Sequence, residues 1–453
     1  MPPEAPEGSG HQRDTGLVRA MGTGALAANI VNSVVGATIF AVPGALAASL
    51  GVYAVLAFVG CALVIGAIAI CFAEAGSRVP TSGGAYGFIE TAFGPLTGYV
   101  AGTVLWFAGA LASGGLAAAV ADVAINLLPP AYAGLAGVLR VAVIIGVIGS
   151  IAAVNVRGVL QGARLINTLT LLKLVPLAVF LVVGATAIEA GNFPLGAFAG
   201  DGEAGHAIIL ALFAYMGMET SLCASGEIAR PARTIPRALV LAMVGVTLLY
   251  TAVQVVAQGI LGPALAQSTV PLADAMARVS PALRLLMLAG AAVSMYGWLS
   301  SDILSSPRIL FALARDGLMP TILGRVHPRT HVPHVAIVAY ATLAVLLALS
   351  GTFTQLAVLS ALATAPLYIA GCAAAWKLAR DRVAMAGDPL NFRWLLPAVL
   401  VGIASMVAMV AMASPTEIAG LALLVGISVA AYLLQTRLRS AVARRTTGSG
   451  AQQ

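Results

Sequence analysis

The sequence predicts an all-α, polytopic membrane protein with about twelve transmembrane helices. Of its 453 residues, 60% are hydrophobic and only 9% are charged, and a water-soluble domain cannot bury that much apolar surface. The 49 glycines and 23 prolines also fit membrane spans, in which small residues let helix backbones approach closely. The apolar residues fall into long runs that are separated by short polar segments.

Each predicted span is a run of about 20 apolar residues, the length that crosses ~30 Å of hydrocarbon. The first run follows a polar tail and is too long for the core of a signal peptide, so we expect it to remain as a span. In chain order the spans are 22–50, 53–76, 94–128, 136–154, 165–188, 206–226, 238–261, 282–306, 333–350, 354–376, 395–413 and 416–434.

The basic residues predict the orientation. If the N-terminus is cytoplasmic, 20 of the 24 Lys and Arg residues lie in cytoplasmic segments. Only Arg140, Arg278 and Arg284 lie outside, and Lys173 lies within a span. Such a bias is typical of cytoplasmic loops. We therefore expect a multi-pass protein of the cell (inner) membrane with both termini in the cytoplasm. The net charge of +7 is spread singly between apolar runs, which does not indicate nucleic-acid binding.

The cysteines do not indicate a disulfide framework or a metal site. All four lie inside apolar segments without paired spacing, which favours small buried side chains. No cofactor is expected. The cysteines are Cys61, Cys71, Cys223 and Cys372.

Two spans are interrupted by segments that contain glycine. The first interruption runs from Val35 to Gly44 in span 1, and the second from Ala214 to Glu227 in span 6. Unwound backbone at membrane depth is tolerated only where it lines a cavity, because free N–H and C=O groups cannot face lipid. Matching interruptions in two halves of a chain indicate a transporter site at an inverted repeat. The alternative is that these glycines only allow close helix packing.

Four segments carry a resemblance to a known family, and they occur in its order. They are GATIFAVPG (36–44) in span 1, FAEAGSRVPTSGGAYGFIETAFG (72–94) after span 2, FAYMGMETSLCASGEIARPARTIPRAL (213–239) in span 6 and its exit, and SPRILFALARDGLMP (306–320) after span 8. Together they resemble the amino acid–polyamine–organocation (APC) transporters over nearly the whole chain.

The resemblance implies the leucine-transporter type fold. A transporter domain over 21–436 would contain two inverted five-helix repeats, spans 1–5 and 6–10, and two accessory helices. Flanking it would be a flexible cytoplasmic N-terminal tail (1–20) and a cytoplasmic C-terminal tail (437–453). The substrate site would lie between spans 1, 3, 6, 8 and 10.

The function implied is secondary active transport and not enzymatic catalysis. We expect a sodium-independent amino acid permease or exchanger that works by alternating access. A polyamine or other organic-amine transporter or antiporter of the same fold is the alternative. The partners expected are a small-molecule substrate and the lipid bilayer, while proton coupling and the oligomeric state stay open.

The expected substrate contacts lie at the two interruptions. Gly36, Ala37 and Thr38 should have free N–H groups at the start of a half-helix, and by resemblance these hold the substrate carboxylate, since such ends carry partial positive charge. The carbonyl groups of Phe213, Ala214 and Met216 should receive the substrate amine. Gly217 permits the unwinding, and Phe213 would close over the substrate. The full predicted set is Val34, Gly36, Ala37, Thr38, Phe213, Ala214, Met216, Gly217 and Asp302.

One departure from the family concerns the first interruption. Ala37 and Thr38 stand where the family usually has the second glycine of Gly-Ser-Gly. Two side chains therefore occupy a place near the expected carboxylate site. The substrate that fits this site stays open.

Three further side chains are predicted to act in coupling or gating. Lys173 lies about nine residues into span 5, where an unpaired ammonium costs at least ~2.5–3.5 kcal/mol. Similar proteins place this ammonium where sodium-coupled relatives bind sodium, against the carbonyls of span 1; snorkelling to the interface is the alternative. Glu219 is a proton-sensing or helix-tethering group, or a carboxyl satisfied by nearby hydroxyls. Tyr215 offers an aromatic face to the substrate or packs in the core.

Asp302 lies on a polar face of span 8. That face is formed by Ser294, Trp298, Ser301 and Ser305, which recur at steps of four, three and four. A carboxylate there would pair with a cationic group of the substrate or with Lys173. Alternatively, it is a protonated acid bonded to Ser301 or Ser305.

The remaining charged residues are expected outside the site. Asp122 should lie at the membrane interface, near the outer end of span 3. In the cytoplasmic loops we expect the pairs Arg78–Glu90, Arg237–Glu227 and Arg308–Asp316.

A channel and an intramembrane enzyme are the competing classes. A channel would more often be a short repeated unit with a filter-like segment, and an enzyme would need clustered nucleophile, base or metal ligands. The sequence shows neither pattern, whereas a transporter accounts for the paired interruptions.

Overall fold

In a computed structural model, the chain folds as a bundle of α-helices. The structure describes residues 21–36, 38–79, 84–126, 134–193, 204–222, 228–315, 317–330, 332–385 and 389–449. Within these residues, eight helices are long and apolar enough to cross a membrane, and three shorter apolar helices accompany them. The predicted fold class, an all-α polytopic membrane protein, is confirmed. The predicted N-terminal tail lies outside the described residues.

Every predicted span contains a helix, and spans 1 and 6 each contain two. Span 1 is split into α1 (Thr23–Val34) and α2 (Thr38–Leu50), and span 6 into α8 (Ala204–Tyr215) and α9 (Met218–Leu222). The other spans are α3 (Ala54–Arg78), α5 (Pro95–Asn126), α6 (Ala136–Arg157), α7 (Val159–Gly184), α10 (Pro231–Leu261), α12 (Pro281–Ser305), α14 (His334–Ser350), α15 (Phe353–Arg380), α16 (Leu395–Ala411) and α17 (Pro415–Ser449).

Shorter helices occupy the connections. Three are α-helical: α4 (Ala85–Phe93), α11 (Pro271–Ala277) and α13 (Pro307–Arg315). Among the described residues, five are 3₁₀ helices: Gly51–Tyr53, Ala185–Ala187, Ala190–Asn192, Gly262–Gln267 and Thr321–Gly324. Helix α17 extends to Ser449, so the segment after residue 436 begins as a continuation of the last span.

Local chemistry explains several helix starts. Helix α15 begins with a capping box, in which Thr352 and Gln355 satisfy each other's backbone N–H groups. Helix α12 begins with Pro281 directly after Ser280, whose side chain accepts the N–H of Ala282. Both helices contribute to the candidate site described below.

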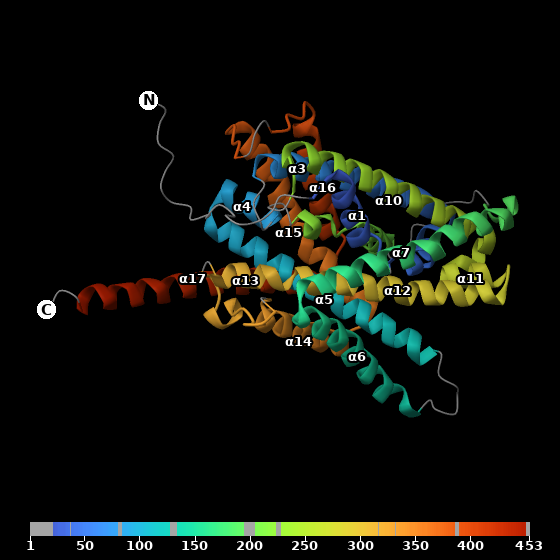
Figure 1. The fold of residues 1–453 in the computed structure, drawn as a ribbon. Coiled ribbons are helices and arrows are strands. Elements are labelled where there is room, and N and C mark those ends of the chain that lie inside the picture. Colours follow the sequence, from blue (N-terminus) through green and yellow to red (C-terminus); the bar gives the residue numbers. More distant parts are fainter. Residues whose placement is uncertain are drawn as a thin grey trace.

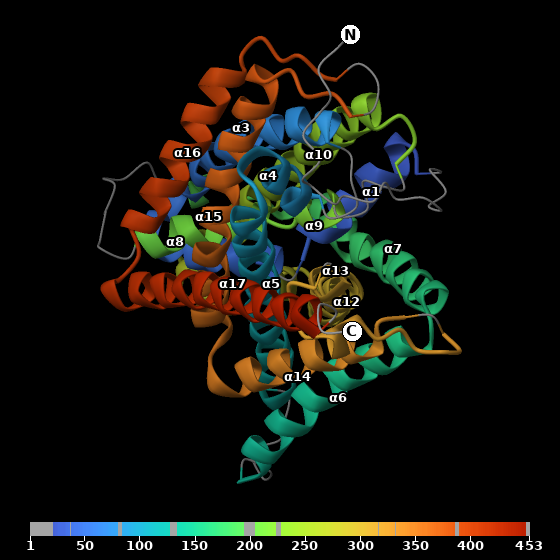
Figure 2. The same ribbon diagram turned by 90° about the vertical axis from the view of Figure 1, so that its left-hand side faces the viewer.

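Helices α5 and α15 form the centre of the bundle. Their most apolar segments are 72% buried, whereas that of α17 is 6% buried. In both ribbon views, α6 and α14 lie on one side of α5 and α12, and α3, α10 and α16 lie on the other (Figure 1, Figure 2). Outward-facing leucines and valines, such as Leu63 on α3 and Leu248 on α10, remain exposed, as expected of a lipid-facing surface.

A buried ion pair joins α3 to the segment between α15 and α16. Arg78 binds Glu74 through Nε (3.0 Å) and Nη2 (2.6 Å). It also donates to the carbonyls of Val383 and Leu390, at 3.2 Å each, and Glu74 accepts the N–H of Phe392 at 3.0 Å. The predicted Arg78–Glu90 pair is therefore wrong, because a partner four residues earlier on the same helix is closer.

The other two predicted pairs cannot be compared with the structure, and the expected place of Asp122 can. Glu227 and Asp316 lie outside the described residues, so their pairs with Arg237 and Arg308 stay predictions. Asp122 pairs with Arg140 of α6, and its side chain is 43% exposed, as expected of a residue at the interface.

Breaking the buried pair should destabilise the protein strongly. Arg78→Ala leaves the Glu74 carboxylate buried without its partner, which costs about 3–5 kcal/mol. Lys377→Ala is the matched control, because Lys377 and Asp381 form an exposed pair of the same spacing, worth about 0–1 kcal/mol. Free energies of unfolding in detergent check this, and equal losses for the two variants would contradict it.

Candidate functional site

The break between α1 and α2 leaves a run of backbone carbonyls without helical partners. From residue 32 to residue 36, every carbonyl accepts a hydrogen bond from a side chain of another helix. The donors are Lys173 Nζ for Asn32 and Val35 (2.8 and 2.7 Å), Trp298 Nε1 for Ser33 (2.7 Å), the Tyr250 hydroxyl for Val34 (2.9 Å) and Ser294 Oγ for Gly36 (3.0 Å). Unwound backbone thus stays satisfied inside the bundle.

Lys173 supplies the charge in this network. Its side chain is fully buried on α7, and two of its three N–H groups point at the carbonyls of Asn32 and Val35. The alternative in which Lys173 reaches the membrane interface is therefore wrong. The ammonium holds α7 to the unwound segment.

The break between α8 and α9 is built on Gly217. Its φ is +122°, a conformation that side chains rarely adopt. Its N–H donates to Glu219 Oε2 (3.0 Å), which also accepts the hydroxyl of Tyr368 on α15 (2.7 Å). Glu219 therefore ties the break to α15, in keeping with the helix-tethering alternative.

The two breaks lie against each other. The Ser33 and Ser221 hydroxyls are 2.9 Å apart. The Tyr250 hydroxyl reaches one carbonyl from each break, that of Val34 at 2.9 Å and that of Ala214 at 3.0 Å. A Cβ on Gly217 would lie 2.5 Å from the Ser33 carbonyl oxygen, so only glycine allows this approach.

Gly217→Ala should therefore destabilise the site. The added methyl group meets backbone, and the positive φ adds strain of about 1–3 kcal/mol. Gly245→Ala on α10 is the matched control, because nothing lies within 4 Å of a Cβ there. We expect a lower melting temperature and slower substrate uptake for the first variant and no loss for the second. Equal melting temperatures and uptake rates for the two variants would show that the close approach of Gly217 to the Ser33 carbonyl is unimportant.

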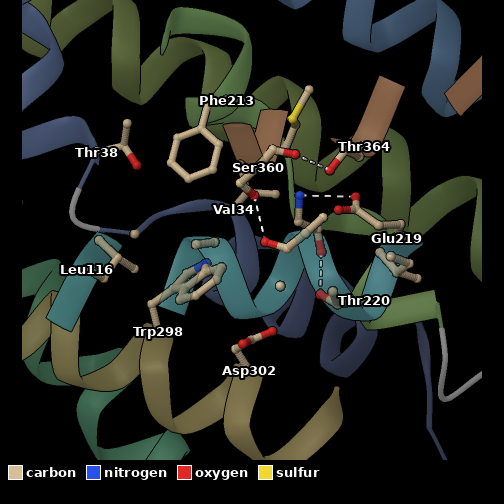
Figure 3. Close-up of a pocket in the computed structure, with 17 residues that line it drawn as sticks. Val34, Thr38, Leu116, Phe213, Glu219, Thr220, Trp298, Asp302, Ser360 and Thr364 are labelled. Carbon is tan, nitrogen blue, oxygen red and sulfur yellow. Dashed lines mark hydrogen bonds between the residues drawn. The ribbon is translucent and has the colours of Figure 1, made fainter. Parts of the chain in front are cut away.

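A cavity of about 40 Å³ lies beside the breaks. Figure 3 shows Phe213 facing Trp298 and Asp302 across it. The lining residues come from α5, α12 and α15 as well as from both breaks: Val34, Gly36, Thr38, Leu105, Ala108, Gly109, Ala112, Leu116, Phe213, Met216, Gly217, Glu219, Thr220, Trp298, Asp302, Ser360 and Thr364.

The structure brings most of the predicted residues together at this cavity. Ala37 lies outside the described residues. Ala214 and Tyr215 do not line the cavity, and the Tyr215 side chain is buried, with its hydroxyl on the Phe58 carbonyl (3.1 Å). Tyr215 therefore follows the core-packing alternative. Lys173 lies behind the unwound segment rather than at the cavity wall.

Several backbone groups that were expected to be free are engaged within the protein. The Gly36 N–H donates to the Val34 carbonyl (2.8 Å), and the Phe213 carbonyl accepts the N–H of Met216 (3.1 Å). The physical reason is that both breaks make tight local turns, which satisfy their own groups. Thr38, the first residue of α2, has no intrahelical acceptor for its N–H, and each carbonyl keeps a second lone pair.

Asp302 binds three hydroxyl groups, two of them from other helices. Its carboxyl accepts from Ser113 of α5 (2.6 Å), from Ser306 beyond the end of α12 (2.6 Å) and from Tyr340 of α14. Neither Lys173 nor the expected Ser301 and Ser305 is among these donors, so those alternatives are wrong. The same face of α12 carries Ser294 and Trp298, which bind the unwound segment.

Sequence reasoning missed the walls that α5 and α15 contribute. Leu105, Ala108, Ala112 and Leu116 of α5 form an apolar wall, and α15 adds hydroxyl groups, with Ser360 bound to the Ala108 carbonyl (2.8 Å). The resemblance placed spans 3 and 10 at the site without naming residues. A run of small residues in α5 was the only available signal.

Comparisons with known proteins agree with this architecture. A family model described as amino acid permease matches residues 21–432. An uncharacterised transporter of Mycobacterium tuberculosis is 32% identical over 430 residues, which cover 93% of this chain and 92% of the relative. The branched-chain amino acid permease BcaP of Lactococcus lactis is 28% identical (75% and 77% covered), and a methylthioribose transporter of Bacillus subtilis is 27% identical (72% and 73% covered).

Proposed function

The chain belongs to the amino acid permease family, and from this premise we propose that it is a sodium-independent secondary transporter of amino acids. The substrate binds in the cavity beside the two helix breaks, and transport proceeds by alternating access. The observation that carries the proposal is the contact of the Lys173 ammonium with the Asn32 and Val35 carbonyls.

Lys173 makes a mobile cation unnecessary. Carbonyl oxygens of unwound backbone in a dry interior need a donor or a cation. A lysine supplies an ammonium group that is covalently attached to the protein, and the resemblance to sodium-coupled transporters implies that it stands where those proteins bind sodium. Transport should then need no sodium.

The cavity suits a small zwitterion. The N-terminal end of α2 at Thr38 carries partial positive charge for a carboxylate, and carbonyls of the α8–α9 break have lone pairs for an amine. The α5 wall is apolar, which favours a neutral side chain. The name of the Lactococcus relative also points to neutral amino acids.

A cationic amine is the second candidate, because the Asp302 carboxyl lines the cavity. We place it second, since that carboxyl already accepts three hydroxyl groups. Competition for uptake of labelled alanine into proteoliposomes decides between the two. Alanine, serine and leucine should compete, whereas lysine, arginine and putrescine should not. Stronger competition by the cationic compounds would overturn the order.

The charge distribution and the two helix breaks support a particular membrane topology for the protein. The protein lies in the cell membrane with both termini on the cytoplasmic side, as the distribution of Lys and Arg supports. Breaks in spans 1 and 6 support two inverted repeats, spans 1–5 and 6–10, with the substrate at their interface.

Thr38 should limit the size of the substrate. It is buried at the cavity wall, so Thr38→Gly enlarges the cavity and should improve competition by leucine and phenylalanine relative to alanine by about tenfold, the effect of roughly 1–3 kcal/mol per methyl-sized group in a pocket. Thr38→Val, which keeps the volume of the side chain and removes only the hydroxyl, is the control. An unchanged ranking of substrates in Thr38→Gly would refute this role.

A further inference from the structure

Asp302 and its hydroxyl partners form a compact group at the cavity wall. The Asp302 side chain is 5% exposed and Ser113 is fully buried. A Cβ on Gly109 would lie within 3.2 Å of the Tyr340 hydroxyl, Ser306 Oγ and Asp302 Oδ1, so α5 can approach only because residue 109 is glycine. The group joins α5, α14 and the junction of α12 with α13.

We propose that Asp302 is a proton-binding site that couples uptake of a neutral substrate to inward proton movement. This inference rests on the proposed function and deepens it by naming the residue that binds the coupling proton. The juxtaposition that carries it is a buried carboxyl at the cavity wall whose described donors are all hydroxyl groups.

A shell of hydroxyl groups accommodates both protonation states. A hydroxyl donates to a carboxylate and can rotate to accept from a carboxylic acid. Asp302 can thus gain or lose a proton while its neighbours stay in place. Glu219 differs, because one of its donors is the N–H of Gly217, which cannot become an acceptor.

The spacing of the oxygens favours a proton over a metal ion. Ser113 Oγ and Ser306 Oγ each lie 2.6 Å from an Asp302 oxygen, which leaves room for a hydrogen atom between them. A metal ion held by oxygen ligands stands about 2.3–2.6 Å from each of them, and this requires ligand oxygens that are farther apart.

Among the described residues, no positively charged side chain contacts Asp302 to compensate the charge of an ionised carboxylate. Tyr340 of α14 contacts it directly, and Glu219 of α9 lines the same cavity. Lys173 of α7 is directed at the α1 carbonyls. The charged side chains on the other elements packed against α12 are exposed or partly exposed: Asp122 of α5, Arg140 and Arg157 of α6, Asp274 of α11, and Arg308 and Arg315 of α13.

Coupling follows from desolvation of the cavity. A neutral substrate that fills the cavity displaces water from Asp302, and an ionised carboxylate next to an apolar side chain is unfavourable. Substrate binding therefore favours the protonated acid, and by linkage protonation favours substrate binding. One proton moves from external water to an Asp302 oxygen, travels with the substrate, and returns to cytoplasmic water when the substrate leaves.

Uptake driven by a pH gradient tests the proposal. Labelled alanine and leucine are the probes, in proteoliposomes with and without an inward proton gradient, and their affinities are measured between pH 5 and 9. In the wild type the gradient should drive accumulation of the substrate. If one proton binds with each substrate, the affinity should weaken by about tenfold per pH unit above the midpoint of its pH dependence. In Asp302→Asn, which cannot titrate, both dependences should vanish.

Two further variants make the test independent of the folding of Asp302→Asn. Asp274→Asn is the matched control, because Asp274 also accepts a serine hydroxyl at 2.6 Å but lies on α11, away from the cavity. In this variant the proton gradient should increase uptake by the same factor as in the wild type. Tyr340→Phe removes one donor to the carboxylate and should move the midpoint to higher pH.

The outcomes separate the two proposals. A gradient response that persists in Asp302→Asn, or a midpoint unchanged in Tyr340→Phe, would overturn the role of Asp302. Wild-type uptake that ignores the gradient would overturn proton coupling alone and leave the proposed function intact. No uptake of either probe by the wild type would overturn both.

Discussion

Lys173→Ala should lower the initial rate of amino acid uptake by at least ~100-fold, while the protein still inserts into the membrane. The substitution removes two charge-assisted hydrogen bonds to the Asn32 and Val35 carbonyls, each worth about 1.5–3 kcal/mol. A free-energy change of that size shifts the ratio between two conformations of the unwound segment by more than 100-fold. Uptake into proteoliposomes that contain equal amounts of folded protein measures the effect.

Lys377→Ala is the matched control for charge. Lys377 forms an exposed pair with Asp381 at the end of α15, so its loss should leave uptake unchanged. Wild-type rates in Lys173→Ala would show that the contact between α7 and α1 is incidental. A loss of uptake in both variants would point to net charge instead of the contact.

Tyr250→Phe should slow uptake by about tenfold and lower the melting temperature. The hydroxyl is the one group that reaches carbonyls of both breaks among the described residues, those of Val34 and Ala214. Its removal leaves a buried carbonyl without a donor, which costs about 1–3 kcal/mol. The Val34 carbonyl keeps the N–H of Gly36 at 2.8 Å, so the loss should fall on Ala214 and on the alignment of the breaks.

Tyr296→Phe provides the matched control for removal of a hydroxyl. The Tyr296 hydroxyl lies 3.0 Å from Ser150 Oγ at an exposed position between α12 and α6. Its loss should change the melting temperature little. If the two variants behaved alike, the bridge between the breaks would have no special role.

The fold was largely predictable from the sequence, because lipid imposes simple rules on it. Apolar runs of sufficient length gave the spans, and Gly36 and Gly217 lie at the two breaks that the sequence indicated. The depth of Lys173 within span 5 marked it as a side chain that needs a partner. Each of these conclusions depends on local properties of the chain.

The partners of the site residues were less predictable, because they come from distant helices. Helical periodicity placed Ser301 and Ser305 near Asp302, yet its donors are Ser113, Ser306 and Tyr340, two of which lie on other spans. Periodicity orders the residues of one helix and contains no information on how neighbouring helices are rotated.

One error had a signal that the sequence did contain, and a second did not. Glu74 lies four residues before Arg78 on one helix, the spacing at which side chains meet, and it is the true partner. The engaged N–H of Gly36 has a different origin, since a chain that leaves a helix through glycine can close a short turn on itself. Local turn geometry of this kind does not follow from the position of a break.

If the tethered Lys173 ammonium replaces a mobile sodium ion, amino acid transport should not depend on sodium. The decisive measurement is the initial rate of labelled alanine uptake into proteoliposomes of purified protein, with sodium or choline as the only external monovalent cation. Saturable uptake at equal rates in the two solutions is the expected result. A strict requirement for sodium would show that Lys173 does not replace the ion, and no saturable uptake of alanine in either solution would refute amino acid transport.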